Sequence, residues 1–387
     1  MIRRHAETIL RELVRSYPVV AITGPRQSGK TTLTRVAFPE KPYVSLEELD
    51  QREFAEEDPR GFLARYPEGA ILDEVQRCPG LFSYLQGVLD HAGRPGMFLL
   101  TGSQQFGLLA GITQTLAGRV ALLHLLPFTL TELESGGWAA RDLDTVLFMG
   151  CYPPVYDRRP SPSGWYANYV QTYVERDVRQ MVNVRDLSPF RRFVRLCAAR
   201  IGQLLNLSGL ANDCGITHNT AKAWLSVLEA SYIVFLLSPH HRNFNKRLVK
   251  TPKLYFYDTG LAAWLLGIRE PSQLAIHALR GALFESWVIS ELLKSRFNRA
   301  LDANLYFWRD RSGHEVDVLV EQSETLLPLE VKSGRTVTRD SIAGLQHWLA
   351  LAGDAAGKSR LVYAGETSHT RSGIEIRSWR DLSSLSI

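Results

Sequence analysis

Cysteine is scarce in this sequence of 387 residues, and its scarcity excludes one kind of site. The four cysteines are scattered along the chain and show none of the spacings that hold a zinc ion. A structural zinc site is therefore not expected, and a reducing, cytoplasmic setting fits this cysteine usage. The cysteines are Cys78, Cys151, Cys197 and Cys214.

Long hydrophobic runs and a strong net charge are also missing. No apolar stretch approaches the roughly 18 residues of a membrane-spanning helix, and the polar segment Met1–Glu7 lacks the pattern of a signal peptide. We therefore expect no membrane association. The net charge of +5 permits a polyanionic partner without requiring one. The content of 45% hydrophobic and 22% charged residues is typical of a soluble globular protein, here with two or three domains.

A phosphate-binding loop is the most informative motif that is present. It lies between the apolar run Val19–Ile22, a predicted strand, and residues 32–37, a predicted helix, which is the context such a loop requires. Glycines let successive backbone N–H groups point at one anion, and the helix N-terminus adds positive potential. We expect Lys30 to reach the β- and γ-phosphates of ATP and the Thr31 hydroxyl to ligate Mg²⁺. The expected nucleotide-binding residues are Gly24, Pro25, Arg26, Gln27, Ser28, Gly29, Lys30, Thr31 and Thr32.

Two acidic residues end a short apolar strand predicted within residues 69–74. Downstream of a phosphate loop, such a pair is the second half of a nucleotide-hydrolysing site. Asp73 is then expected to hold the Mg²⁺ shell and Glu74 to polarise the attacking water. The alternative is a strand that ends in two solvated acids, a pattern that is common in isolation.

The next predicted strand, Met97–Leu100, runs into polar residues that can sense the γ-phosphate. Here the chain resembles the AAA+ type of P-loop ATPase, in which an extra strand lies between the two motif strands. The resemblance implies that Thr101 or Ser103 is the sensor. It also implies that Arg119, in the segment Leu116–Arg119, is an arginine finger for a neighbouring subunit of a homo-oligomer. A surface arginine that closes a helix is the alternative.

A helix-turn-helix pattern spans residues 206–227, with two predicted helices around the glycine-containing turn Cys214–Ile216. Two predicted strands, residues 233–237 and 253–257, follow as a wing with a basic connector. We expect the outward face of the second helix to read base edges and the connector to contact phosphates. Winged helices also serve as packing modules, so a purely structural role stays open. The expected DNA-contacting residues are Thr217, His218, Asn219, Lys222, Arg242, Lys246 and Arg247.

The C-terminal third places charged residues inside apolar strands. Glu330 and Lys332 project from one face of a predicted strand, and Asp317 lies on the neighbouring strand. The order helix-strand-strand-strand-helix-strand, with these residues, resembles the PD-(D/E)XK nuclease fold. Asp317 and Glu330 would then share a Mg²⁺ ion whose shell Glu285 completes. Lys332 would stabilise the attacking hydroxide or the developing charge. The alternative is a salt-bridged cluster on a half-exposed sheet, and cleavage itself stays open.

The combination of parts resembles a prokaryotic family of ATPases whose C-terminal region is of unknown function. The resemblance covers nearly the whole chain, including Gly24–Thr31, Leu72–Glu74 and Tyr255–Gly260. It implies an α/β fold with a P-loop AAA+ ATPase domain, a winged-helix domain and a C-terminal PD-(D/E)XK restriction-nuclease-like α/β domain. The expected boundaries are 1–135 for the ATPase core, 136–190 for a helical lid or linker, 191–260 for the winged helix and 261–387 for the nuclease-like domain.

The expected function is that of a cytoplasmic, Mg-ATP-dependent ATPase that binds DNA and remodels or processes it. Branched or single-stranded DNA, as in repair or recombination intermediates, is the expected substrate class. The alternative is an ATP-driven switch, or a regulator of transcription or defence, whose winged helix and nuclease-like domain only bind DNA or protein. A small-molecule kinase is a third candidate, disfavoured by the long remainder that resembles DNA-binding modules.

Overall fold

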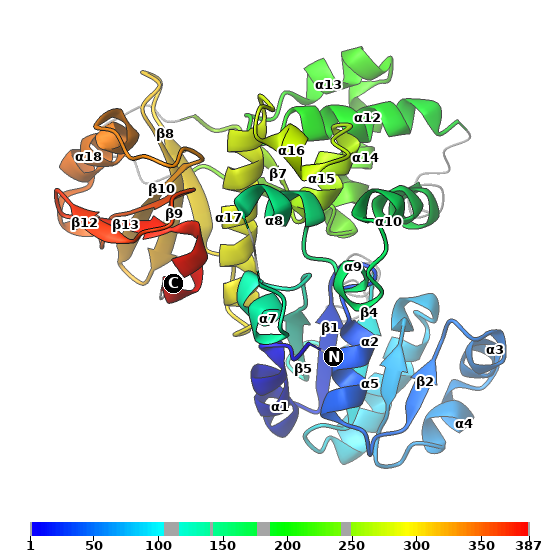
Figure 1. Cartoon of the computed structure of the whole chain (residues 1–387). Helices are drawn as coiled ribbons and strands as arrows, with labels where there is room; N and C mark the ends of the chain where they lie inside the picture. Colours follow the sequence, from blue (N-terminus) through cyan, green and yellow to red (C-terminus); the bar gives the residue numbers. More distant parts are fainter. Residues whose placement is uncertain (1, 104–115, 140–141, 176–185, 241–248, 386–387) are drawn as a thin grey trace. The chain divides into compact units, whose positions relative to one another are not determined.

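The computed structural model describes residues 2–103, 116–139, 142–175, 186–240 and 249–385 of the chain (Figure 1). Among the helices of the described ranges, none is both long enough and apolar enough to cross a bilayer. The chain divides into two compact units. Unit 1 comprises Met1–Phe128, Ala230–Tyr232 and Arg296–Leu301, and unit 2 comprises Thr129–Glu229, Ile233–Ser295 and Asp302–Ile387.

A five-stranded parallel sheet forms the centre of unit 1, in the order β2-β3-β4-β1-β5 (Figure 1). β4 therefore lies between β1 and β3, which is the arrangement that the resemblance to AAA+ ATPases implies. Because the strands are parallel, their carboxyl ends meet at one edge of the sheet. The strands are β1 (Val19–Thr23), β2 (Tyr43–Ser45), β3 (Ile71–Asp73), β4 (Phe98–Gly102) and β5 (Val120–His124).

Helices cover both faces of this sheet. Alternate strand residues point to opposite sides, and because the residues on both sides are apolar, each face needs helices to bury it. Val20 and Ile22 share a buried core with α1 and α2, whereas Val19 and Ala21 share one with α3, α4 and α5. All of β1 is buried, as expected for the centre of a parallel sheet. The helices are α1 (Ala6–Ser16), α2 (Lys30–Ala37), α3 (Leu49–Glu57), α4 (Pro59–Ala64) and α5 (Leu81–Ala92), with a 3₁₀ turn η1 (Val75–Arg77).

Unit 2 begins with a series of helices and contains the antiparallel pair β6 and β7. A single π-helical turn, η2 (Val170–Val174), follows α10. The elements of this part are α7 (Leu130–Ser135), α8 (Leu143–Met149), α9 (Pro153–Asp157), α10 (Pro162–Tyr169), α12 (Ser188–Ala199), α13 (Leu207–Cys214), α14 (His218–Ala230), β6 (Val234–Leu237), β7 (Lys253–Phe256), α15 (Thr259–Leu265), α16 (Pro271–Leu274) and α17 (Arg280–Phe297).

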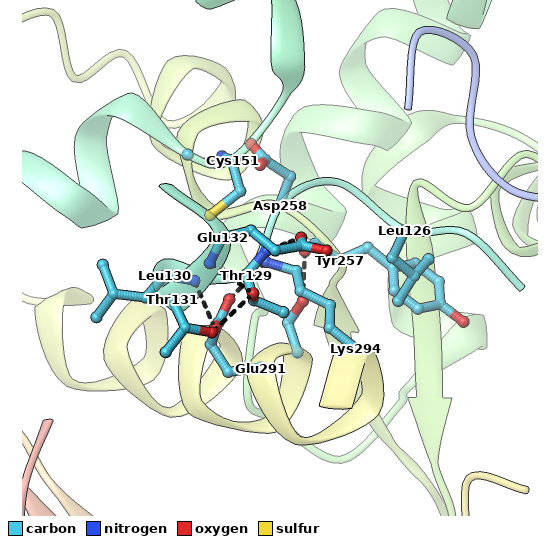
Figure 2. Close-up of polar contacts among 12 residues, drawn as sticks. Leu126, Thr129, Leu130, Thr131, Glu132, Cys151, Tyr257, Asp258, Glu291 and Lys294 are labelled. Carbon is cyan, nitrogen blue, oxygen red and sulfur yellow. Dashed lines mark hydrogen bonds and ion pairs between the residues drawn. The ribbon is translucent and has the colours of Figure 1, made fainter. Parts of the chain in front are cut away.

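A buried polar cluster fixes the start of α7 against α17 (Figure 2). Thr129 and Glu132 form a capping box, in which each side chain accepts a hydrogen bond from the other residue's backbone N–H. Glu291 of α17 accepts a further bond from the Leu130 N–H at 2.9 Å and pairs with Lys294 at 2.7 Å. Leu130 and Glu291 are 161 positions apart, so the cluster joins distant segments of unit 2.

A six-stranded sheet forms the C-terminal part of unit 2, in the order β12-β13-β11-β10-β9-β8. β8 to β10 form an antiparallel meander, and β10, β11 and β13 pair in parallel. Leu345 and Trp348 of α18 pack into the core on one face. The order α17, β8, β9, β10, α18, β11 is the predicted one, whereas the sequence did not indicate β12 and β13. The elements are β8 (Leu305–Arg309), β9 (Glu315–Gln322), β10 (Thr325–Lys332), α18 (Asp340–Ala352), η3 (Gly353–Ala355), β11 (Arg360–Tyr363), β12 (His369–Arg371), β13 (Ile374–Ser378) and η4 (Trp379–Ser384).

The approach of the chain to β3 depends on one glycine. Gly69 has a φ of +84°, and a Cβ there would lie 1.7 Å from the carbonyl oxygen of Met97. We predict that Gly69→Ala destabilises the protein by at least about 2 kcal/mol, because it adds backbone strain to a clash with main chain. Gly87→Ala on α5 is the control, since its Cβ meets nothing within 4 Å and alanine favours helix by about 1 kcal/mol. Equal melting temperatures for the two variants would contradict this account.

Candidate functional site

The backbone of the loop after β1 surrounds the side chain of Lys30. Gly29 has a φ of +93°, a conformation that favours glycine. The Lys30 Nζ donates hydrogen bonds to the carbonyl oxygens of Gly24 at 3.0 Å and Pro25 at 2.8 Å. Burial lowers the pKa of Lys30 to about 8, although Glu74 and Asp73 favour its charged form. A buried ammonium held by carbonyl groups is suited to an incoming anion, which would stabilise its charge.

A second feature of the loop points to a ligand. The hydroxyl of Ser28 is buried and has no hydrogen-bond partner among the described residues. A buried hydroxyl without a partner costs free energy, so a ligand atom that satisfied it would be stabilised there. Thr32, on the first turn of α2, is exposed.

Arg4, near the N-terminus, supports the loop, and the sequence analysis did not select it. The Arg4 guanidinium donates to the carbonyl oxygens of Ser28 at 2.7 Å and Leu126 at 2.6 Å and lies over the Phe128 ring. With 7% of its surface exposed, Arg4 joins the loop to the segment after β5. A lone arginine before a helix carries no local signal of this role.

Tyr232 supports the same region from a distant point of the chain. Its hydroxyl lies 3.3 Å from the Thr23 hydroxyl, directly before the loop, and 2.8 Å from the His124 Nδ1. Tyr232 lies between α14 and β6 in sequence but belongs to unit 1. It is almost fully buried and has a φ of +56°, so the chain turns sharply here to insert the ring.

Asp73, at the end of β3, receives hydroxyl groups from three elements. Its carboxylate accepts hydrogen bonds from Thr31 on α2 at 3.0 Å, from Tyr43 on β2 at 2.7 Å, and from Thr101 on β4. Thr31 and Asp73 thus present neighbouring oxygen atoms, which is the donor type that Mg²⁺ prefers. The parallel pairing of β1, β4 and β3 brings these side chains to one edge of the sheet.

Glu74 follows Asp73 in a left-handed conformation, with a φ of +55°. Its carboxylate accepts hydrogen bonds from the Ser103 hydroxyl at 3.0 Å and from the Gln76 amide. The two hydroxyl residues after β4 therefore divide between the acids, Thr101 to Asp73 and Ser103 to Glu74.

Among the described residues, the contacts of the Arg119 side chain are with Asp90 and Ala117, not with the phosphate loop. Its guanidinium pairs with Asp90 of α5 at 2.6 Å, and the two side chains remain 37% and 42% exposed. An ion pair this exposed contributes little to stability. Arg119 therefore lies on the surface of unit 1.

A second charged cluster lies where β9, β10 and α17 meet in unit 2. The Lys332 ammonium pairs with Glu330 on β10, and the Asp317 carboxylate on β9 accepts the Val331 N–H at 2.8 Å. Burial, with Asp317 nearby, raises the pKa of Glu330 to about 8. Burial and the Asp317 charge also raise the pKa of Glu285 to about 7. The cluster thus contains one cation, Lys332, which interacts with three carboxyl groups, those of Asp317, Glu330 and Glu285.

The β6–β7 pair adds two residues to this cluster that the sequence analysis missed. The Lys253 Nζ lies 3.2 Å from a Glu285 oxygen and also pairs with Glu315 of β9, while the Tyr255 hydroxyl donates to Glu285. Burial opposes the charge of Lys253, but Glu285 and Asp317 outweigh it and raise its pKa. Lys253 and Tyr255 lie on one face of β7 and alternate along the strand with the apolar residues of the other face. This alternation is a signal that could have identified them.

The region predicted to be a helix-turn-helix contains the helices α13 and α14, joined at Gly215 with a φ of +68°. The Asn206 side chain caps α13 by accepting the Gly209 N–H at 2.9 Å. Leu210, Ala211, Ala221 and Leu225 are buried, and Ile216 is half-buried. The expected DNA-facing residues Thr217, His218, Asn219 and Lys222 are exposed, whereas Arg242, Lys246 and Arg247 lie outside the described residues.

Comparison with known proteins assigns the family. Residues 16–134 match the AAA domain, and residues 140–272 and 280–381 match two domains of unknown function, DUF8612 and DUF4143. The uncharacterized proteins Mb2031c of Mycobacterium bovis and Rv2008c of Mycobacterium tuberculosis are each 32% identical to this chain over 370 residues. These matches cover 94% of this chain and 80% of each relative. The chain therefore belongs to the AAA+ family of P-loop ATPases.

Two solved structures show more distant similarity to this ATPase. The Walker-type ATPase PABY2304 of Pyrococcus abyssi is 14% identical with a TM-score of 0.47, over 68% of this chain and 96% of its own. AMPPCP-bound DnaA of Aquifex aeolicus is 16% identical with a TM-score of 0.30, over 58% and 85%. The family itself implies nucleotide binding, typically with Mg²⁺, and so supports the expectation for the loop of unit 1.

The two halves of the nucleotide site should fail in different ways when changed. We predict that Lys30→Ala abolishes measurable ATP binding, because it removes the cation of the loop. Glu74→Gln should retain ATP binding but slow hydrolysis by at least about 100-fold, because it removes the expected base. Binding of a fluorescent ATP analogue and phosphate release measure the two effects. Glu53→Gln, an exposed acid on α3, is the control and should change neither.

The buried ion pairs of unit 2 make a separate stability prediction. Lys253→Met should destabilise the protein by about 3–5 kcal/mol, because Glu285 and Glu315 lose a buried cation. The double variant Lys253→Met/Glu285→Gln should recover part of this loss, since one uncompensated carboxylate is removed. Chemical unfolding of the three proteins measures both effects, and a double variant no more stable than Lys253→Met would contradict the pairing.

Proposed function

We propose that this AAA+ ATPase uses Mg-ATP to bind and remodel or process DNA, with branched or single-stranded DNA as its substrate class. The observation that carries the proposal is the interaction of Asp317, Glu330, Lys332 and Glu285 in unit 2. Carboxylates on neighbouring strands beside a lysine are suited to grip a phosphate backbone through a divalent cation. The other support is the exposed polar face of α14.

In the ATPase reaction, each residue of the unit 1 site has a distinct task. Lys30 would neutralise the β- and γ-phosphates, and the Thr31 hydroxyl and Asp73 carboxylate would hold Mg²⁺, which supplies charge neutralisation when bound. Glu74 would orient and polarise the attacking water. Thr101 and Ser103, each bonded to one of the acids, would sense whether the γ-phosphate is present.

Arg119 supports a homo-oligomer in this proposal. Its guanidinium is partly exposed on the surface of unit 1 and pairs with an exposed partner, Asp90, with a long hydrogen bond to the Ala117 carbonyl oxygen beside it. It can exchange this ion pair for a neighbouring subunit's nucleotide at little cost. A cytoplasmic setting fits the four cysteines, which are free thiols.

DNA contact in the proposal is divided between two parts of unit 2. The exposed N-terminal residues of α14 would contact the duplex, as in helix-turn-helix proteins. The C-terminal nuclease-like domain would hold the phosphate backbone, with Asp317, Glu330 and Glu285 around a divalent cation. Lys332 would stabilise charge on the phosphate or on an attacking hydroxide. These tasks are compatible with cleavage and with binding alone.

A second function, an ATP-driven switch whose C-terminal domain only binds, is favoured by Lys253. Its buried ammonium already compensates Glu285 and Glu315, which is the electrostatic task that a catalytic cation would perform. A domain stabilised in this way can keep its fold without a metal ion. The two functions differ in whether a phosphodiester bond is broken.

The proposal predicts that DNA stimulates the ATPase. Phosphate release should rise at least severalfold with four-way-junction or single-stranded DNA compared with no DNA, and Glu74→Gln should remain inactive under every condition. Lys222→Glu should reduce this stimulation while leaving the basal rate unchanged, because it reverses a charge on the exposed face of α14. Basal activity that no DNA changes, together with no binding at low salt, would contradict a DNA-acting role.

Cleavage is tested with the same protein on supercoiled DNA. If the domain cuts, nicking with Mg²⁺ or Mn²⁺ should be lost in Asp317→Asn and in Lys332→Ala but kept in Lys30→Ala. Absence of nicking in the wild type, with DNA binding intact, would assign the domain to binding and favour the switch.

A further inference from the structure

Three potential metal ligands meet at the turn between β8 and β9, in a place that the proposed function does not use. Asp310 follows β8, His314 precedes β9, and His347 lies on α18. One ligand atom from each of the three residues lies within 4.8 Å of the other two. The turn and the helix are thus joined by a group of two imidazoles and one carboxylate.

The separations in this group are close to those that a metal ion imposes. Asp310 Oδ2 lies 3.3 Å from His314 Nδ1 and 3.9 Å from His347 Nε2. For metal–ligand bonds of about 2.0–2.2 Å in a tetrahedral site, neighbouring ligand atoms are about 3.3–3.6 Å apart. The other Asp310 oxygen accepts the His314 backbone N–H at 3.0 Å, which fixes the carboxylate. The carboxylate is therefore oriented before any ion binds.

The burial of these groups supports a ligand independently. The Asp310 side chain is only 1% exposed, although a carboxylate is normally solvated. The Nε2 of His347 is buried and makes no hydrogen bond with any described residue. The imidazoles of His314 and His347 stack face to face, with centroids 3.8 Å apart, so one ring has to rotate before both rings can point a nitrogen at the same ion. A buried ring nitrogen without a partner costs free energy, and a metal–nitrogen bond would remove that cost.

We propose that Asp310, His314 and His347 bind a divalent transition-metal ion of the zinc type. Two imidazole nitrogens and one carboxylate form a donor set that suits Zn²⁺ rather than Mg²⁺. The acidic cluster around Asp317 and Glu330 offers only oxygen donors and suits Mg²⁺ or Mn²⁺ instead. The two sites are therefore chemically distinct. Three protein ligands leave one position of a tetrahedral zinc site for water.

The position of the site gives the ion a structural consequence. It would link the β8–β9 turn to α18, which already lies so close to β9 that a Cβ on Gly344 would be 2.5 Å from the Glu315 carbonyl oxygen. β9 also carries Asp317. The ion would hold β9 and α18 together beside the strand of the acidic cluster. The cysteine spacing gave no sign of such a site, because its ligands are histidine and aspartate.

The test is a titration of the full chain with Zn²⁺ after removal of bound metal by a chelator, without ATP or Mg²⁺. Calorimetry should show tight binding to one site in the wild type, and the melting temperature should rise with Zn²⁺. His314→Ala, on the partly exposed turn, and His347→Ala should each weaken binding by at least about tenfold.

Controls separate this site from others in the chain. His369→Ala, an exposed histidine on β12, and Asp317→Asn should bind Zn²⁺ as the wild type does. Titration with Co²⁺ should give visible absorption bands in the wild type that His347→Ala loses. Undetectable Zn²⁺ binding to the wild type, or equal affinity in the wild type and both histidine variants, would overturn the proposal.

Discussion

The parallel pairing of β4 between β1 and β3 is the constraint on which the ATPase site depends. With all strands running in one direction, the loop after β1, the acids after β3 and the hydroxyl residues after β4 meet at one edge. The hydrogen bonds from Thr31 and Thr101 to Asp73 exist only in this arrangement. A sheet with β3 directly beside β1 would leave Thr101 without this contact.

The charged cluster of unit 2 follows a different principle, the compensation of buried charges. Glu330 and Glu285 are removed from water, which favours their neutral forms, and Lys332 and Lys253 oppose this effect. Lys332 on β10 pairs with Glu330, whereas Lys253 on β7 pairs with Glu285. Because each lysine has its own partner, loss of either one leaves a buried carboxylate uncompensated. Retention of so many buried charges is easier to explain by a functional role than by stability.

The sequence predicted those features that are encoded locally. The phosphate loop, the acids after β3 and the strand–helix order of the C-terminal part were all readable because each depends on neighbouring residues, and the AAA+ assignment is confirmed by the family match. Arg4 and Tyr232 were not predicted, since their partners lie far away in sequence. Lys253 was also missed, although its alternation with apolar residues on β7 was a local signal. The strand β12 was missed because it is short and exposed, without apolar alternation. The strand β13 does alternate, with Ile374 and Ile376 buried, and was overlooked because it is only five residues long.

The insertion of Tyr232 beside the phosphate loop has a consequence for how the protein is made. Unit 1 takes its last segment from Arg296–Leu301, although its sheet is complete by residue 124. During synthesis the sheet therefore emerges from the ribosome long before the residues that finish its surroundings. N-terminal domains tend to fold first. Thr23 and His124 of the nascent ATPase unit therefore stay uncovered until the segment Ala230–Tyr232 has been synthesised and Tyr232 can bind to them.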